Sequence, residues 1–115
     1  MALRVSRHTI LDTEIRKAEP QHAVVILTGE LDTSNVGQLY EELAQLTRES
    51  VRHIAIDLAD LEFVDSTGLS AIIAAHKRAE ASGGELILLA PSRDMRRLFQ
   101  VTGIDDYLNI RPAEA

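Results

Sequence analysis

Three apolar stretches separated by segments of helical periodicity are the feature that most limits how this chain can fold. The apolar stretches are AVVILTG at 23–29, HIAIDLA at 53–59 and ELILLA at 85–90. Strands that alternate with helices lie parallel to their neighbours and are joined by right-handed crossovers. We therefore predict an α/β fold with a mixed, mostly parallel sheet of four to five strands and about three to four helices.

The first strand pair is expected to be joined by a turn. DTEIRK at 12–17 alternates weakly, Glu19-Pro20-Gln21 is typical of a turn, and the apolar run at 23–29 follows directly. Because that run is apolar at almost every position, we expect it to be buried on both faces, as in a parallel sheet. A short last strand is predicted at 107–110.

Apolar residues at steps of three and four mark three helix faces. The faces comprise Val36, Leu39, Tyr40, Leu43 and Leu46; then Leu69, Ile72, Ile73 and His76; and last Met95, Leu98, Phe99 and Thr102. Thr33 and Ser34 are the candidate N-caps of the first helix, and Ser92 is the candidate N-cap of the third. Gly83-Gly84 and Gly103 are expected to end the second and third helices.

Length and composition indicate one intracellular domain. A chain of 115 residues can bury one core, so we treat 1–115 as a single domain, with 1–12 and 111–115 expected to be peripheral or frayed. It contains no cysteine, and no apolar run approaches the roughly 20 residues of a membrane span. The N-terminus lacks the apolar core of a secretion signal. These features predict a cytoplasmic protein that does not enter the membrane.

Charge and residue types argue against several kinds of ligand. The net charge is −6, and the chain has two Phe, two Tyr and no Trp, which does not suit nucleic-acid binding. The four histidines, His8, His22, His53 and His76, show no metal-ligand spacing. We expect no direct nucleic-acid partner, no metal and no cofactor.

Two acidic turns follow predicted strands, and each precedes a helix. GELDTSN at 29–35 contains Asp32 and Thr33, and LEFVDSTGLSAII at 61–73 contains Asp65-Ser66-Thr67-Gly68. In open parallel sheets, sites gather where the carboxyl ends of strands meet helix N-termini. Both turns should therefore lie at the same edge of the sheet.

The Asp65-Ser66-Thr67-Gly68 segment has two interpretations. Ser66 is a good N-cap, and Asp65 complements the positive end of the helix dipole. The same free N–H groups would tolerate a phosphate on Ser66, although Asp65 and Asp32 would repel its roughly −1.5 to −2 charge. Gly68, which lacks a side chain, would leave room for a kinase or partner. The pattern alone leaves both interpretations open.

Two catalytic or phosphoryl-accepting alternatives fit less well. A serine hydrolase would need a base for Ser66, but there is no Gly-x-Ser-x-Gly frame, and His76 lies about three turns along the same helix, facing the core. A receiver domain would use Asp57 at a strand end as acceptor. It would also need paired acids after the first buried strand, where Glu30 and Asp32 stand apart, and a lysine after the third. We expect no enzymatic activity.

Several motifs together resemble a known family. VILTGELDTSN at 25–35, the Val-Asp-Ser-Thr-Gly-Leu turn at 64–69 and a late Leu-Phe-x-x-x-Gly at 98–103 occur at separations that resemble the STAS domain. The likeness is greatest to the stand-alone bacterial anti-sigma factor antagonists, and it runs from about residue 14 to residue 110. Any one of these motifs alone would be weak, but the combination is specific.

The resemblance implies a partner-switching function. In that family the serine after the aspartate, here Ser66, is phosphorylated by the anti-sigma factor, a serine kinase that uses ATP and magnesium. The unphosphorylated antagonist binds the anti-sigma factor and frees a sigma factor, and a serine phosphatase reverses the modification. Asp32 and Asp65 match acidic residues beside the site. Thr67 stands where the family often has Ser, so it is a minor alternative acceptor.

The expected docking face combines the two turns with the exposed side of the Ser66 helix, so that Asp32, Thr33, Asp65, Thr67 and Gly68 surround the modified residue. A STAS adaptor that does not switch, such as a stressosome component or an accessory subunit of a lipid-transport ATPase, is the alternative function. The sequence leaves open whether the chain also forms a homodimer.

Overall fold

The structure, a computed structural model, describes residues 10–19 and 21–112. Within these ranges the chain forms five strands and three helices, which confirms the predicted α/β class. In chain order they are β1 (Leu11–Glu19), β2 (His22–Leu31), α1 (Val36–Arg48), β3 (His53–Val64), α2 (Ser66–Ala81), β4 (Glu85–Leu89), α3 (Arg93–Thr102) and β5 (Asn109–Arg111).

The five strands form one sheet in the order β1-β2-β3-β4-β5. β1 pairs antiparallel with β2, and the other three pairings are parallel, so the mixed and mostly parallel sheet is confirmed. Pro20 of the predicted turn lies outside the described residues. β3 continues to Val64, five residues past the predicted stretch, and β5 starts two residues later than expected. The extra length of β3 carries the chain directly to Asp65.

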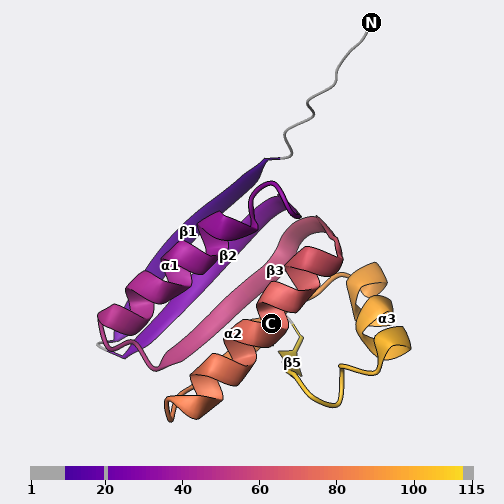
Figure 1. Ribbon diagram of the computed structural model, residues 1–115. Coiled ribbons are helices and arrows are strands. Elements are labelled where there is room, and N and C mark those ends of the chain that lie inside the picture. Colours follow the sequence, from indigo (N-terminus) through magenta and orange to yellow (C-terminus); the bar gives the residue numbers. More distant parts are fainter. Residues whose placement is uncertain (1–9, 20, 113–115) are drawn as a thin grey trace, which may run out of the picture.

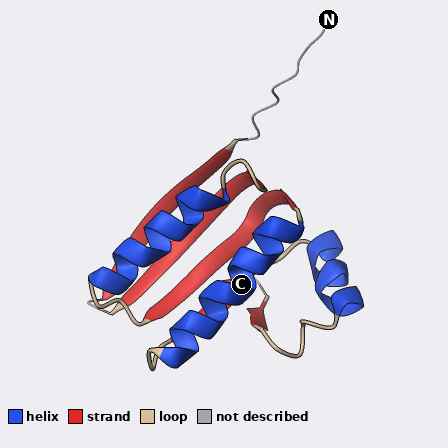
Figure 2. Ribbon diagram, in the orientation of Figure 1, coloured by secondary structure: helices blue, strands red, loops and turns tan. Residues whose placement is uncertain are grey.

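Burial of the sheet is one-sided, which corrects the expectation for β2. Ala23, Val25 and Leu27 are buried, whereas the alternate residues Val24 and Ile26 remain partly exposed. The cause is the strand order: each crossover leads to the next strand along the sheet, so right-handed connections place successive helices on the same face. Figures 1 and 2 show α1 and α2 side by side over one face of the sheet.

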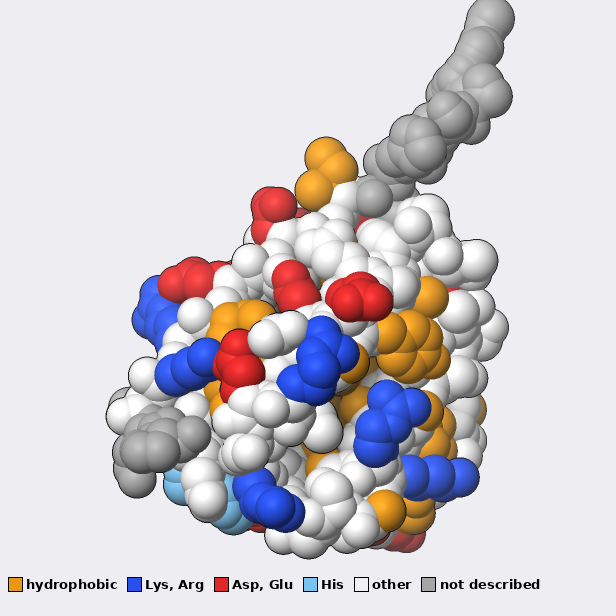
Figure 3. All heavy atoms as spheres, turned by 60° about the vertical axis from the view of Figure 1, so that its left-hand side comes forward, with side chains coloured by type: hydrophobic (Ala, Val, Ile, Leu, Met, Phe, Trp, Pro, Cys, Tyr) orange, Lys and Arg blue, Asp and Glu red, His pale blue; other side chains and the backbone are white. Residues whose placement is uncertain are grey.

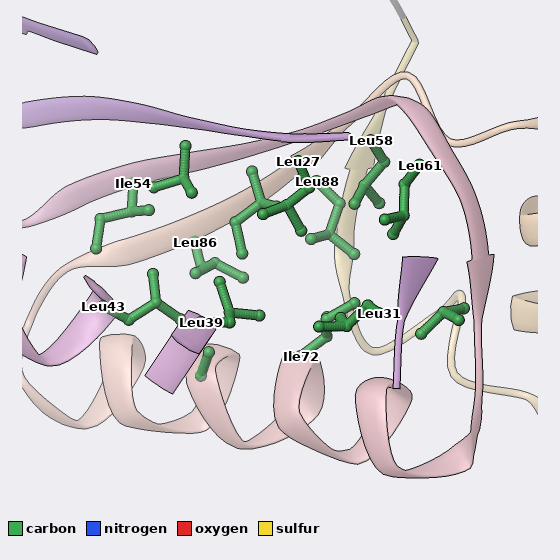
Figure 4. Close-up of a cluster of buried hydrophobic side chains, with 14 of the residues drawn as sticks. Leu27, Leu31, Leu39, Leu43, Ile54, Leu58, Leu61, Ile72, Leu86 and Leu88 are labelled. Carbon is green, nitrogen blue, oxygen red and sulfur yellow. The ribbon is translucent and has the colours of Figure 1, made fainter. Parts of the chain in front are cut away.

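The core lies between that face and the helices (Figure 4). In Figure 4, Leu31 of β2 lies beside Ile72 of α2, and Leu27 of β2 and Leu39 of α1 belong to the same cluster; all four are fully buried. Phe99 of α3 belongs to the same cluster and is also fully buried. Complete burial of one such side chain contributes about 1.5–3 kcal/mol. These contacts hold the N-terminus of α2 against the end of β2.

Some residues at the edges of the predicted helix faces are more exposed than expected. Tyr40 is 37% exposed and Ile73 is only partly buried. Thr102 is exposed, and its hydroxyl donates to the carbonyl oxygen of Leu98 at 2.8 Å. The predicted helix ends are confirmed, because Gly83 and Gly103 lie just beyond α2 and α3.

The helix caps agree with the sequence at α3 but not at α1. Ser92 caps α3 by accepting a hydrogen bond from a backbone N–H of the first turn, as predicted. The N-cap of α1 is Asn35, so the prediction of Thr33 or Ser34 is wrong. The reason is local hydrogen bonding, since the carboxylate of Asp32 accepts from both the N–H and the hydroxyl of Ser34.

Parts of the two end segments, expected to be peripheral or frayed, lie in the edge strands of the sheet. Leu11 opens β1 and is 5% exposed, and Arg111 ends β5. Residues 1–9 and 113–115 lie outside the described ranges. Across residues 10–19 and 21–112, none of the helices has the length and apolar character needed to span a membrane.

Candidate functional site

The two acidic turns meet at the carboxyl edge of the sheet, as predicted. β2 ends at Leu31 and β3 ends at Val64, and these two residues are paired in the parallel register. The backbone N–H of Asp65 donates to the carbonyl oxygen of Leu31 at 3.2 Å. The turn that contains Asp32 and the turn that contains Ser66 are therefore adjacent.

Asp65, rather than Ser66, is the N-cap of α2. One carboxylate oxygen of Asp65 accepts a hydrogen bond from the backbone N–H of Gly68 at 2.8 Å. The other accepts from the N–H of Thr33 at 3.3 Å, and the hydroxyl oxygen of Thr33 lies 3.4 Å from it. An N-cap contributes roughly 1 kcal/mol to helix stability. The same carboxylate thus starts α2 and ties it to the turn after β2.

The three hydroxyls at this edge have different environments. The hydroxyl of Thr33 donates to the hydroxyl oxygen of Thr67 at 3.0 Å, and Thr67 is partly buried. Ser66 is the first residue of α2 and is exposed, and its hydroxyl makes no hydrogen bond within the described part of the chain. Ser66 therefore presents a free oxygen nucleophile, whereas Thr67 is engaged.

Asp32 shapes its own turn. Its carboxylate accepts hydrogen bonds from the N–H of Ser34 at 2.9 Å and from the hydroxyl of Ser34 at 2.6 Å. Its backbone N–H donates to the side chain of Asn35 at 3.0 Å. Thr33 makes the hydrogen bonds to Asp65 and Thr67. Asp32 contributes indirectly, because it fixes the turn conformation that places Thr33 within reach of both residues.

Gly68 does not leave room for a partner, and this part of the sequence interpretation is wrong. Gly68 is buried, and a Cβ there would lie 2.7 Å from Cγ2 of Val64 and 2.9 Å from both Cγ and the carbonyl oxygen of Leu31. At these distances a side chain would fit only if Val64, Leu31 or the backbone moved. The glycine lets α2 approach the end of β2 closely enough for Asp65 to reach Thr33.

Phe63 is a feature of this edge that the sequence analysis missed. It is 50% exposed, lies three residues before Ser66, and pairs in register with Glu30 of β2. The predicted strand stops at residue 59, whereas β3 continues to Val64 and so includes Phe63. In fact Leu61 and Val64 are buried, while Glu62 and Phe63 between them are exposed.

His76 does not act as a base for Ser66. It lies ten residues further along α2, which at 1.5 Å per residue is about 15 Å. It is 2% exposed, its Nε2 lies 3.4 Å from a carboxylate oxygen of Glu80, and its ring meets that of Tyr107 edge-on. The expected burial of this histidine is confirmed, but its Nδ1 has no hydrogen-bond partner among the described residues.

Asp57 does not occupy the position that a receiver domain would need. It lies within β3 rather than at its end, and its carboxylate accepts from the N–H of Ala59 at 3.0 Å. Among residues 10–19 and 21–112, no group of three or more His, Asp or Glu side chains could hold a metal ion. The site at the sheet edge thus offers the free hydroxyl of Ser66, next to the N-cap Asp65 and to Thr67, whose hydroxyl is hydrogen-bonded.

Comparison with known proteins agrees with this geometry. The family model of the STAS domain matches residues 14–115. This chain belongs to the STAS domain family. The match includes both turns and all of α2.

Relatives of this STAS domain are regulatory proteins by name. The anti-sigma-B factor antagonist of Listeria monocytogenes is 29% identical over 104 residues, which cover 90% of this chain and 91% of that protein. Among solved structures, the anti-sigma factor antagonist SpoIIAA in its unphosphorylated form is 27% identical with a TM-score of 0.71, covering 90% of this chain and 89% of that one. The Bacillus cell fate determinant SpoIIAA in the phosphorylated form is 28% identical with a TM-score of 0.73, covering 90% and 92%.

Proposed function

We propose that this STAS domain is an anti-sigma factor antagonist and that phosphorylation of Ser66 switches off its binding to an anti-sigma factor. The observation that carries the proposal is the exposed hydroxyl of Ser66, which is free of hydrogen bonds within the described residues at the first position of α2. The similarity to SpoIIAA, which is described in both phosphorylated and unphosphorylated forms, supports it.

The proposed partners follow from the switch. The anti-sigma factor is a serine kinase that binds ATP with magnesium, and the γ-phosphoryl group of that ATP is transferred. The hydroxyl oxygen of Ser66 forms the new P–O bond as its proton is lost and ADP leaves. A serine phosphatase hydrolyses that bond and restores the binding form. The chain itself acts as a regulatory protein rather than as an enzyme, and we place it in the cytoplasm, where sigma factors engage RNA polymerase.

The charge at Ser66 explains how modification stops docking. A phosphate brings roughly −1.5 to −2 charges to a position next to the carboxylate of Asp65. In a protein contact that phosphate would lose water without gaining a positive partner, which is unfavourable. Each 1.4 kcal/mol changes affinity about tenfold, so a few kcal/mol is enough for a switch. The hydrogen bonds of Asp65 to Gly68 and Thr33 keep the site folded in both states.

Selectivity for Ser66 over Thr67 follows from the hydrogen bonds. The oxygen of Thr67 accepts the Thr33 hydroxyl at 3.0 Å and is partly buried, so modification there requires that contact to break. Ser66 requires no such rearrangement. Thr67 stays a minor acceptor in the proposal.

The test is a kinase reaction with the purified protein and its anti-sigma factor. The two proteins are mixed with Mg-ATP, and intact mass and peptide mass are measured. We expect the addition of one phosphate, which fragmentation of the peptide assigns to Ser66, and at most a minor amount, on Thr67, in Ser66→Ala. Affinity is then measured for the unmodified and modified proteins. We expect the Ser66→Ala variant to bind like the unmodified protein and the phosphorylated protein to bind at least about tenfold more weakly.

The same experiment separates the switch from a non-switching STAS adaptor. An adaptor would bind its partner equally well with and without phosphate at Ser66, or would never acquire phosphate when kinase and ATP are present. Either result would refute the proposed switch.

A further inference from the structure

The arginines of α3 form a stripe on its exposed side. Arg93, Arg96 and Arg97, which we call the arginine stripe, lie at positions i, i+3 and i+4, and Gln100 follows at i+7. Residues with this spacing share one helix face. All are exposed, and they line one shallow hollow together with Asp94. The residues of α3 that enter the core lie on the opposite side of the helix.

Helix stability does not explain these charges. The N-terminal end of a helix carries partial positive charge and favours anions, so cations there oppose the dipole. Arg93 is the first residue of α3, and Arg96 and Arg97 lie in its first half, whereas Asp94 is the one acidic residue of the first turn and the last turn contains no basic residue. The positive charges of the arginine stripe therefore lie at the end of α3 where the helix dipole is also positive.

The guanidinium groups of the stripe also make no ion pair or hydrogen bond with other described residues. Elsewhere, Arg16 pairs with Glu14 at 2.7 Å, and Lys17 donates to Glu49, which lowers the pKa of that carboxyl. On the face drawn in Figure 3, several blue side chains lie next to red ones, whereas others stand apart from any red side chain. Within residues 10–19 and 21–112, the side chains of the arginine stripe have no ion pair and no hydrogen bond. Their donors face solvent in a chain whose net charge is −6.

The surface extends from the stripe toward β5. Arg96 lines a second hollow together with Arg111 and Ile110 of β5, so a fourth guanidinium adjoins the stripe. The start of α3 also borders the outer part of β3, where Asp94 shares a hollow with Glu62. In the view of Figure 1, α3 lies toward the same side as the N-terminal end of α2. The basic surface thus adjoins the outer part of β3, which leads to Ser66, but it is made from different elements.

We propose that the arginine stripe and Arg111 form a second binding surface, which takes an acidic segment of a protein partner. Arginine binds carboxylates through paired N–H donors, and three arginines on one helix face can engage several acidic side chains at once. At physiological salt, charges interact strongly only within about 8 Å, so a short acidic peptide on this surface would interact mainly with the nearby arginines. A long polyanion or an anionic membrane would also meet the acidic remainder of the chain, which disfavours them.

The test is an NMR titration of the full-length ¹⁵N-labelled protein with a hexaglutamate peptide in 50 mM NaCl. We expect saturable shifts confined to 92–100 and 111, and at least fivefold weaker binding in 300 mM NaCl. The variant Arg96→Glu/Arg97→Glu should lose at least tenfold in affinity. Its control, Lys77→Glu/Arg78→Glu on α2, changes the net charge equally and should bind within twofold of wild type. Melting curves confirm that both variants fold.

Three results would overturn the inference: no binding by the wild type, equal loss of binding in both double variants, or shifts that spread over the whole surface. Tighter binding of a six-nucleotide single strand or of anionic phosphatidylglycerol vesicles to the same residues would also overturn it, because the surface would then suit polyanions in general. None of these measurements involves Ser66 or a kinase, so failure here is separate from failure of the proposed switch.

Discussion

Replacing Gly68 with alanine is predicted to destabilise the domain, although alanine is the better helix former. Gly68 is the third residue of α2 and faces the end of β2. The added Cβ would lie 2.7 Å from Cγ2 of Val64 and 2.9 Å from the carbonyl oxygen of Leu31. The methyl group of Val64 can turn away, but the carbonyl oxygen is part of the β2 backbone. Relief therefore requires α2 to move away from the sheet.

The expected magnitude combines two opposing effects. Overpacking a core costs about 1–3 kcal/mol, and contact with the backbone places this site toward the upper end. Exchanging glycine for alanine within a helix returns up to about 1 kcal/mol. The net loss in the free energy of unfolding should be about 1–2 kcal/mol. For a domain of this size the melting temperature should fall by roughly 4 °C for each kcal/mol.

The assay is urea unfolding followed by circular dichroism, with Gly37→Ala as the matched control. Gly37 is the second residue of α1 and is exposed, and a Cβ there would meet nothing within 4 Å. That variant should be unchanged or stabilised by up to about 1 kcal/mol. If Gly68→Ala were as stable as Gly37→Ala, the close approach of α2 to Leu31 would not be real, and the positioning of Asp65 beside Thr33 would lose its structural basis.

Three further predictions concern the cap, the core and the choice of acceptor. Asp65→Ala should lower the free energy of unfolding by about 1 kcal/mol in the same urea assay, because α2 loses its N-cap; an unchanged midpoint would contradict this. Phe99→Ala should cost about 3–5 kcal/mol, because the ring is fully buried, and a loss below about 1 kcal/mol would show that α3 is not anchored there. Thr33→Val should free the hydroxyl of Thr67, so the share of phosphate on Thr67 should rise in the kinase reaction; peptide fragmentation that shows Ser66 alone modified would refute the selectivity argument.

Much of the fold follows from periodicity. The helix faces of Leu39 and Ile72 and the three apolar strands are correctly predicted, because burial of one face imposes a repeat that the residues display. The same reasoning failed for the exposed face of β2. Residues such as Val24 and Ile26 favour strands whether or not a helix covers them, so composition does not reveal that both long helices lie on one side.

At the site, the sequence correctly brings the two turns to one edge but does not reveal the hydrogen bonds between them. Thr33 and Ser34 both suit an N-cap by residue type, and only the path of the chain decides that Thr33 instead reaches Asp65, 32 residues later. The glycine at position 68 likewise fits two explanations: space for a binding partner, which the sequence suggested, and close approach to Leu31 of β2, which the structure shows. Local patterns cannot choose between such alternatives, because the distance to a residue on another strand decides them.

The most direct test of the proposed switch is the affinity of the protein for its anti-sigma factor before and after stoichiometric phosphorylation, with the modified residue assigned by fragmentation of the phosphopeptide. The account predicts phosphate on Ser66 and a loss of affinity of about tenfold or more. Phosphate on another residue, or equal affinity of the two forms, would contradict it.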